Sequence, residues 1–249
     1  MYIDSHCHIQ TMEHPELIID AMGENLMIVN GTDLVSNQQA IALAEQYKNV
    51  YAAVGCLPES KCDCDVDDLS FRALLENSNV VAIGEIGLDY YWDTTYNEEQ
   101  RQVLEQMLNY AEEYHKPVIL HQRNSFEDII SALDRHPNVT GILHSFCGTL
   151  AEAQAFIDRG MLLGINGMVT FRKNDGLRAV VKEIPLEYIV LETDSPYLAP
   201  EPVRGKINTP LNIQYIAEKI GNIKNISYGE VMEHTLGNII SRFDISKNL

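Results

Sequence analysis

The sequence predicts an α/β fold, a single (β/α)8 TIM barrel that spans residues 1–249. Apolar segments of strand length alternate with helix-like segments along the whole chain. Such alternation is typical of a parallel sheet, and eight units in about 250 residues favour one closed barrel over two smaller domains. An open doubly wound sheet is the alternative, but no Gly-x-Gly-x-x-Gly pattern follows the first strand-like segment.

The first half of the chain contains four of the predicted strand and helix pairs. Its strands are continuous apolar runs, as expected for a parallel sheet covered on both faces. In the longest helix, Val103, Leu104 and Met107 share one face, and Asn97 with Gln100 resembles a capping box. We expect strands at 2–6, Leu26–Gly31, Val50–Cys56 and Val80–Gly87, and helices at Pro15–Met22, Asn37–Tyr47, Leu69–Leu75 and Asn97–His115.

The second half repeats this alternation. Thr209 followed by Pro210 is a helix start in the usual order, a capping residue and then proline at the first helical position. We expect strands at Pro117–His121, Thr140–His144, Met161–Ile165 and Tyr188–Asp194, and helices at Ser125–Arg135, Leu150–Arg159, Gly176–Glu183, after Pro210, and at Tyr228–Phe243.

Composition restricts the environment and the partners of the chain. No apolar run approaches the ~20 residues that span a membrane, and no signal peptide is visible at the N-terminus. The five cysteines, Cys7, Cys56, Cys62, Cys64 and Cys147, have no disulfide-framework spacing, so we expect a reduced, cytoplasmic protein. Cys56, Cys62 and Cys64 are a weak alternative zinc site, because their spacing matches no usual zinc pattern.

The charge balance is strongly acidic, with 18 Lys and Arg against 36 Asp and Glu and a formal net charge of −18. Long-range attraction to a polyanion is therefore not expected. A local site could still accept an anion if bound cations supplied positive charge there.

Polar side chains with metal-binding chemistry end several predicted strands. Four of the eight histidines in the chain stand at such positions. In a TIM barrel the carboxyl ends of the strands form one rim, which carries the active site. Six ligands exceed the needs of one tetrahedral ion and suit two, with a bridging glutamate. The predicted ligands are His6, His8, Glu85, His121, His144 and Asp194.

These same residues lie in five segments that resemble the TatD family of metal-dependent deoxyribonucleases. The resemblance implies a TIM barrel with two divalent cations, Mg²⁺, Mn²⁺ or Zn²⁺, and hydrolysis of phosphodiester bonds, typically in DNA. One cation would be held by His6, His8, Glu85 and Asp194, and the other by Glu85, His121 and His144. The segments are Asp4–His8, Gly84–Tyr91, His121–Arg123, His144–Gly148 and Glu192–Pro200.

Further residues are assigned roles around this centre. Asp194 is the candidate general base or orienter of the attacking water, beside Glu85 as the other catalytic carboxylate. Arg204 and Arg123 are candidates for phosphate binding. Ser195 is better explained by a turn before Pro196 than as a nucleophile. The aromatic residues that follow Glu85 (Tyr90, Tyr91 and Trp92) could stack on bases or pack in a loop.

The leading hypothesis is a metal-dependent phosphodiesterase that trims DNA ends, with DNA as its partner, no membrane partner, and a monomer rather than an obligate oligomer. A second hypothesis keeps the metals and changes the substrate to a small ester, lactone, amide or phosphoester, which suits the net charge of −18 better. A third is a binding protein with an inert metal centre.

Overall fold

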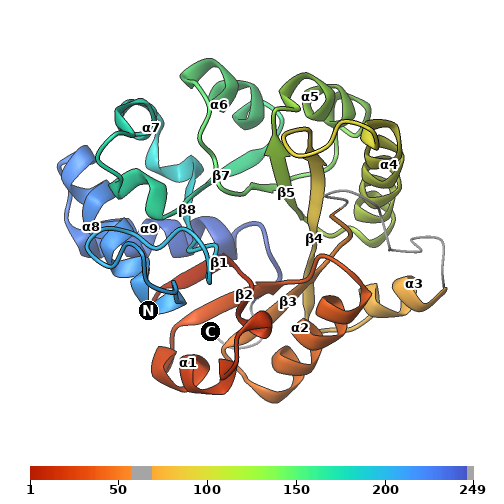
Figure 1. Ribbon diagram of the computed structural model, residues 1–249, viewed down its shortest axis with the longest axis horizontal. Coiled ribbons are helices and arrows are strands. Elements are labelled where there is room, and N and C mark those ends of the chain that lie inside the picture. The colour runs from red at the N-terminus through yellow and green to blue at the C-terminus, as the bar shows by residue number, and fades with distance from the viewer. Residues whose placement is uncertain (58–68, 246–249) are drawn as a thin grey trace.

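The computed structural model describes residues 1–57 and 69–245 of the chain. Its strands form one eight-stranded parallel sheet in which each strand pairs with the next along the chain, from β1 to β8. This order, wrapped around a central axis in Figure 1, confirms the predicted TIM-barrel class. The strands are β1 Ile3–Cys7, β2 Leu26–Asn30, β3 Val50–Val54, β4 Val80–Asp89, β5 Val118–Arg123, β6 Gly141–Leu143, β7 Met161–Ile165 and β8 Ile189–Leu191.

Helices surround the strands as an outer layer (Figure 1). None of those in the described residues is long and apolar enough to cross a membrane. Short 3₁₀ turns at Ile9–Thr11, Gly167–Thr170, Leu186–Tyr188 and Pro210–Asn212 join the elements. The α-helices are α1 Pro15–Met22, α2 Leu34–Gln46, α3 Leu69–Leu75, α4 Asn97–Tyr114, α5 Phe126–Arg135, α6 Leu150–Ile157, α7 Asp175–Glu183, α8 Ile213–Lys224 and α9 Tyr228–Ile240.

Apolar side chains pack in two layers, one inside the barrel and one between strands and helices. In β2, Ile28 belongs to the inner cluster, whereas its neighbours Met27 and Val29 belong to the outer one. This alternation follows from the two-residue period of a strand. The continuous apolar runs in the sequence therefore serve both faces of the sheet.

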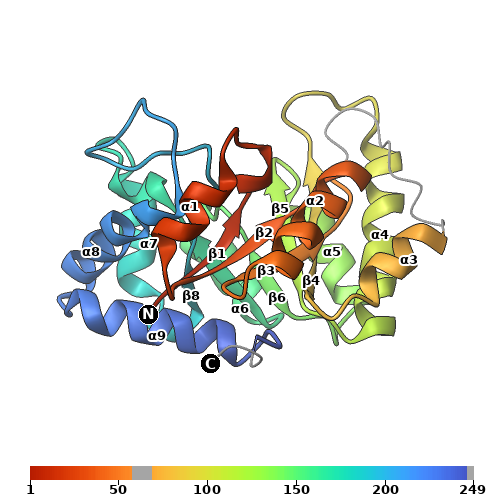
Figure 2. The ribbon, with the colours of Figure 1, turned by 90° about the horizontal axis from the view of Figure 1, so that it is seen from below.

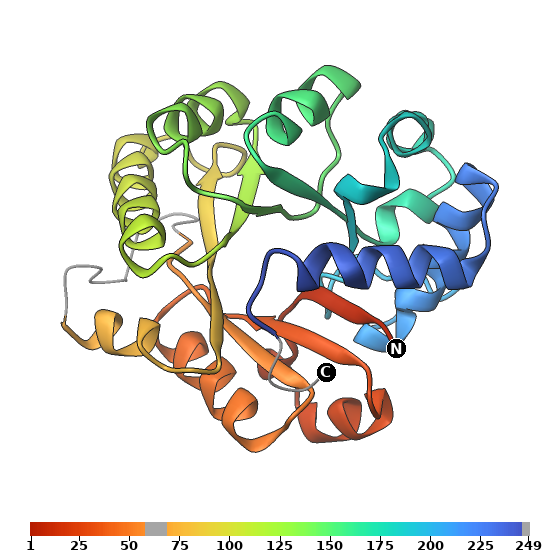
Figure 3. The ribbon, with the colours of Figure 1, turned by 180° about the vertical axis from the view of Figure 1, so that it is seen from behind.

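The C-terminal segment closes one end of the barrel. Figure 3 shows α9 lying across the end of the barrel where the chain begins. Phe243 and Ile245, which follow this helix, join the inner cluster, and the Tyr51 hydroxyl donates to the Ile245 carbonyl oxygen at 2.8 Å. In Figure 2 the loops that follow β1, β4 and β8 rise at the opposite end, which we call the mouth.

Register shifts in two strands turn key side chains toward the inside of the barrel. In β1, Ile3 belongs to the inner cluster and Cys7 to the outer one, although residues four apart share a face in a regular strand. The pairing with β2 shifts between Asp4 and Cys7. This irregularity reverses the alternation, so that His6 and His8 face inward at the end of the strand.

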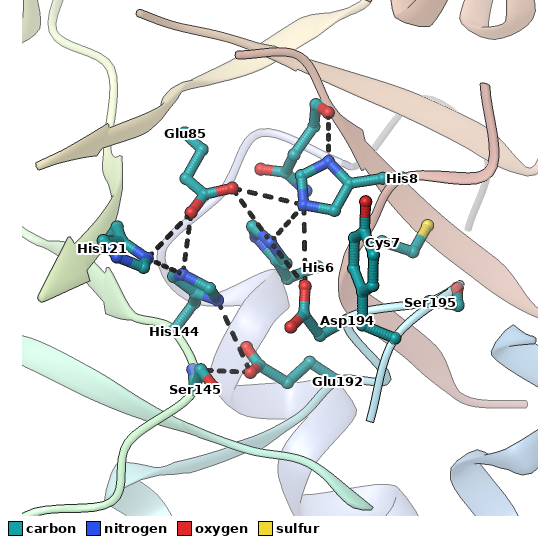
Figure 4. A network of polar contacts seen from close by, with 12 residues as sticks. His6, Cys7, His8, Glu85, His121, His144, Ser145, Glu192, Asp194 and Ser195 are labelled. Carbon is teal, nitrogen blue, oxygen red and sulfur yellow. Dashed lines mark hydrogen bonds and ion pairs between the residues drawn. The ribbon is translucent and has the colours of Figure 1, made fainter. Parts of the chain in front are cut away.

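A register shift also turns a side chain inward in β4. Its pairing with β5 shifts between Gly84 and Ile86, and Ile83 and Ile86 both lie in the outer cluster, although residues three positions apart face opposite sides of a regular strand. Glu85 consequently faces the barrel interior, as Figure 4 shows.

The first and last strands, β1 and β8, meet along a seam at which the Asp4 side chain bonds to the segment that follows β8. The buried Asp4 carboxylate accepts hydrogen bonds from the Thr193 backbone N–H, at 2.9 Å, and from the Thr193 hydroxyl. Burial raises the pKa of Asp4 to about 7 against the opposing effect of these bonds. Beyond it, Asp194 N–H donates to the His6 carbonyl at 3.0 Å and His8 N–H to the Ser195 carbonyl at 2.7 Å.

Some element boundaries differ from the sequence predictions for local reasons. Helix α2 begins at Leu34 rather than Asn37, because Asp33 and Ser36 form a capping box. The capping box predicted at Asn97 and Gln100 is wrong. Gln100 is fully buried and bonds instead to the backbone of Asp89, at 2.9 and 3.0 Å, which ties α4 to the end of β4.

Candidate metal centre

All six predicted ligands gather at the mouth of the barrel (Figure 4). Only His121 and Asp194 keep more than a tenth of their side chains exposed, at 19% and 15%. Asp194 lies three residues beyond β8, which ends at Leu191, and His144 directly follows β6. The ligands therefore lie either at the carboxyl ends of strands or in the short segments that directly follow them.

One group of donors contains four atoms. The Nε2 atoms of His6 and His8 are 3.0 Å apart. Glu85 Oε2 lies 3.4 Å from the first and 3.2 Å from the second, and Asp194 Oδ1 lies 3.6 Å from each. The residues come from β1, β4 and the segment after β8, so this group exists only in the folded chain.

A second group uses the other oxygen of the same glutamate. Glu85 Oε1 lies 3.1 Å from His121 Nδ1 and 2.9 Å from His144 Nε2, and the two nitrogens are 3.0 Å apart. Figure 4 shows Glu85 between the two pairs of histidines. One carboxylate thus faces both groups.

The spacing of these donors fits a metal ion. Four ligands at about 2.1 Å in a tetrahedron are about 3.4 Å from one another, and the donor separations in both groups run from 2.9 to 3.6 Å. A grouping by proximity alone also combines His6 with Glu85 and His144, because the His6 and His144 rings stack at 4.0 Å. We favour the division by Glu85 oxygens because it uses every ligand once and the carboxylate twice.

Charges within the cluster keep its carboxylates ionised. Burial disfavours the charged form of Glu85, but the neighbouring histidines, His144 foremost, hold its pKa well below the usual range. Burial likewise opposes ionisation of Asp194, and a hydrogen bond and the charge of His6 outweigh it, so the pKa of Asp194 is lowered. Both side chains therefore present anionic oxygens to a cation.

The pKa values of the histidines move in opposite directions, and burial together with the charge of His6 lowers that of His144 to about 4. Burial lowers the pKa of His6, but Glu85 and Asp194 raise it well above its ordinary value. Burial also opposes protonation of His121, whose pKa nevertheless rises to about 9 beside Asp89 and Glu85. Because a metal binds the neutral ring, a cation would displace protons here.

A further shell of polar contacts orients the ligands, and sequence reasoning missed it. His8 Nδ1 lies 2.8 Å from the Asn30 carbonyl oxygen, and His121 Nε2 lies 3.1 Å from Asp89 Oδ2. Such contacts on the second ring nitrogen fix the tautomer and direct the first nitrogen to a metal. Asp89 and Glu192 lie inside two of the five segments that carry the family resemblance, Gly84–Tyr91 and Glu192–Pro200, and their acidic character there was the available signal.

Glu192 lies behind His144 in a space left by a glycine. Its Oε1 accepts from Ser145 N–H at 2.6 Å and lies 3.9 Å from His144 Nδ1. Its Oε2 and His144 Nδ1 are both buried without a hydrogen-bond partner. A Cβ on Gly164 would come within 2.2 Å of Glu192 Oε2 and 3.0 Å of His144 Cα. Gly164 therefore makes room for the glutamate beside this ligand.

Substitution of Gly164 by Ala should weaken metal binding. The added methyl group must displace the Glu192 carboxylate from its contacts behind His144, and it would also crowd the His144 backbone, whose Cα it would approach to 3.0 Å. Loss of such outer contacts typically costs ~10–100-fold in metal affinity, and we expect a change of that order. Competition with a chromophoric chelator measures it. Gly176→Ala, whose Cβ meets nothing within 4 Å, is the control, and equal affinity of the two variants would contradict the prediction.

The two predicted substrate arginines are each stacked on an aromatic ring. Arg123 ends β5 and has its Cζ 3.7 Å from the Tyr91 ring centroid. Arg204 follows β8 and has its Cζ 3.7 Å from the Phe171 ring centroid. Neither guanidinium makes a hydrogen bond or ion pair to another residue that the structure describes.

Ser195 is fully buried, which fits the predicted turn rather than a nucleophile. Tyr197 N–H donates to the Asp194 carbonyl at 2.8 Å, and Asp194 takes a left-handed φ of 55°. The Ser195 backbone and hydroxyl bond to Thr193 at 3.1 and 2.9 Å.

The cysteine predictions are only partly met. Cys7 and Cys147 are free, but Cys56 is disulfide-bonded, so the expectation of a fully reduced chain is wrong at that residue. A disulfide sulfur is not a thiolate, and this removes Cys56 from the alternative zinc site. Cys62 and Cys64 lie outside the described residues.

A parallel eight-stranded barrel with buried imidazoles and carboxylates at its mouth defines the class of this protein, a metal-dependent hydrolase. Residues 3–244 match the model of the family described as TatD related DNase. The chain belongs to this family.

Relatives of known sequence and structure agree with this placement. The chain is 34% identical to the uncharacterized metal-dependent hydrolase YabD of Bacillus subtilis, over 99% of this chain and 100% of the relative. The crystal structure of YjjV, a TatD homolog from Escherichia coli, matches with a TM-score of 0.90 and 28% identity over 98% of both chains. A TatD family hydrolase from Entamoeba histolytica, 22% identical, shares the fold with a TM-score of 0.83 over 98% of both chains.

Proposed function

We propose that the protein hydrolyses phosphodiester bonds in DNA with a pair of divalent cations, Mg²⁺, Mn²⁺ or Zn²⁺. The observation that carries this proposal is the sharing of Glu85 between two donor groups, since its oxygens lie 3.2 Å from His8 Nε2 and 2.9 Å from His144 Nε2. Two-metal centres bridged in this way recur in enzymes that cleave phosphate esters.

The proposed ligands are divided between the two ions. His6, His8, Glu85 and Asp194 would hold one ion, and Glu85, His121 and His144 the other. Bound divalent cations supply positive charge that acidifies an attacking water and offsets charge on the phosphate oxygens. This local charge removes the objection that a net charge of −18 raises against a polyanionic substrate.

Residues of the chain position the substrate and the attacking water and accept its proton. Asp194 is held ionised and can accept a proton from the attacking water or orient it. Arg204 and Arg123 keep their guanidinium donors available for phosphate oxygens. Because His6 and Glu85 are buried, solvent is excluded from the inner side of the proposed metal centre.

A small ester, lactone, amide or phosphoester substrate is the second candidate. The net charge of −18 favours it, because a small molecule does not need attraction over a long surface. Barrels that share this fold at 14% identity include the phosphotriesterase homology protein of Escherichia coli, solved with phosphate in its active site, with a TM-score of 0.66.

Metal removal tests the proposal directly. We expect chelation to abolish hydrolysis of a 3′- or 5′-labelled oligonucleotide and readdition of Mg²⁺, Mn²⁺ or Zn²⁺ to restore it. Elemental analysis of the active protein should find two ions per chain. A parallel screen of nitrophenyl esters, lactones and phosphotriesters separates the two candidates. Turnover of a small ester with no cleavage of DNA in any metal would reject the nuclease proposal.

A further inference from the structure

We propose that Tyr91, Trp92 and Arg123 form a rim platform on which a base of the DNA substrate stacks, next to the scissile phosphodiester. This inference rests on the proposed function and names the contact that selects a nucleic acid over a small ester. Nucleobases stack on aromatic side chains and on arginine, whatever their sequence.

The three side chains form an ordered assembly on the protein surface. Arg123 Cζ lies 3.7 Å from the Tyr91 ring centroid and 5.2 Å from the Trp92 ring centroid. The two aromatic rings meet edge to face, with centroids 4.8 Å apart at 88°. Tyr91 is 52% exposed and Trp92 is 68% exposed. Large aromatic faces held in place yet open to solvent are suited to a planar ligand.

The rim platform is continuous with the candidate metal centre. Asp89 links them, because its Oδ2 lies 3.1 Å from His121 Nε2 and its Oδ1 accepts from Tyr91 N–H at 2.8 Å. Arg123 is two residues after His121 in the same strand. The rim platform therefore lies close enough in the chain for a substrate held at the metal centre to reach it with a neighbouring base.

Tyr90 is not part of the rim platform. It is half-buried, and its hydroxyl donates to Asp128 at 2.6 Å and accepts from Arg101 at 3.1 Å. These contacts anchor the segment before Tyr91 to α4 and α5. The sequence alternative of loop packing thus holds for Tyr90, and base stacking is assigned to its two successors.

A hollow beside the rim platform leaves room for the rest of a nucleotide. It measures about 560 Å³ and lies next to Arg123, and its lining includes Gln122 and Asn124 together with the acidic side chains of Glu127, Asp128 and Glu152, so a phosphate there depends on the Arg123 guanidinium for positive charge. The Arg123 guanidinium bonds to no other described residue, so its edge can meet a phosphate while its face remains stacked. Stacking does not depend on net charge, which matters in a chain of charge −18.

A direct binding test follows from the composition, because Trp92 is the only tryptophan in the chain. The metal-loaded protein is titrated with a phosphorothioate-linked oligonucleotide, which resists hydrolysis. Quenching of the tryptophan emission at saturation is expected for the intact strand. An otherwise identical strand with abasic sites should bind more weakly and leave the emission unchanged. Binding of the intact strand without any change in Trp92 emission would overturn the platform.

Steady-state kinetics of Trp92 variants provide a second test of the rim platform. Trp92→Ala should lower kcat/KM for the natural oligonucleotide about tenfold, mainly through KM, because stacking of one base contributes on that order. Trp92→Phe, which keeps an aromatic face, should recover most of the loss, and the abasic strand should be cut equally by parent and variant. Tyr228→Ala, which removes an exposed ring at the start of α9, is the matched control.

The outcomes separate this inference from the proposed function. Normal cleavage of the natural strand by Trp92→Ala would reject the rim platform and leave the nuclease activity standing. If the parent protein cuts no DNA, the nuclease proposal fails, and the titration alone then decides whether the rim platform binds a base.

Discussion

Replacement of Glu85 by Gln should abolish hydrolysis and release metal from the protein. The carboxylate lies within 3.4 Å of a nitrogen from each of four histidines, with a separate oxygen for each pair. A glutamine of the same shape keeps the packing but loses the charge and one acceptor oxygen. Loss of several kcal/mol of metal-derived stabilisation corresponds to a fall of about 10³-fold or more in kcat/KM.

Two measurements check this expectation. Elemental analysis of Glu85→Gln should find fewer than two ions per chain, and thermal unfolding should remain cooperative. Glu13→Gln changes the net charge equally at a side chain that is 93% exposed, and should match the parent. Parental activity in the Glu85 variant would show that the cluster is not the catalytic centre.

Substitution of Gly87 by Ala should cause the largest loss of stability. Gly87 has a φ of 145°, and a Cβ there would lie 2.0 Å from the carbonyl oxygen of His121 on the paired strand. The backbone cannot move away without separating β4 from β5, which carry Glu85 and His121. Strain together with this backbone clash should lower the free energy of unfolding by about 4 kcal/mol or more.

Thermal unfolding of the metal-free protein measures this effect. A loss of that size lowers Tm by about 10 °C in a chain of this length. Gly237→Ala is the matched control, because its Cβ in α9 meets nothing within 4 Å, and alanine favours a helix by about 1 kcal/mol. An unchanged Tm for Gly87→Ala would mean that β4 and β5 are not packed as described.

The barrel was predictable from sequence because its signal is repeated. Every strand is an apolar run and every gap contains a helical pattern, so an error in one element does not change the class. The ligands were predictable for a related reason. Histidine is scarce, and His6, His8, His121 and His144 stand where predicted strands end. Their convergence follows from the parallel order of the strands, which the structure confirms.

Other features could not be read from local patterns. The register shifts at Asp4–Cys7 and Gly84–Ile86 depend on pairing between strands, which periodicity along one strand does not reveal. Gln100 matched a capping pattern, yet a tertiary contact with Asp89 displaced the local one. Asp89 and Glu192 looked like ordinary acids because their histidine partners are remote in sequence.

The seam between Asp4 and Thr193 has a consequence for biosynthesis. Segments far apart in the chain contribute to the four-donor group, since His6 and His8 are made early and Asp194 only after about three quarters of the 249 residues. A nascent chain on the ribosome therefore exposes its paired imidazoles for most of translation without the carboxylate that completes them. Ribosome-bound chains stalled before residue 194 should lack hydrolytic activity, and no nascent chain can become competent until β8 has cleared the exit tunnel and docked against β1.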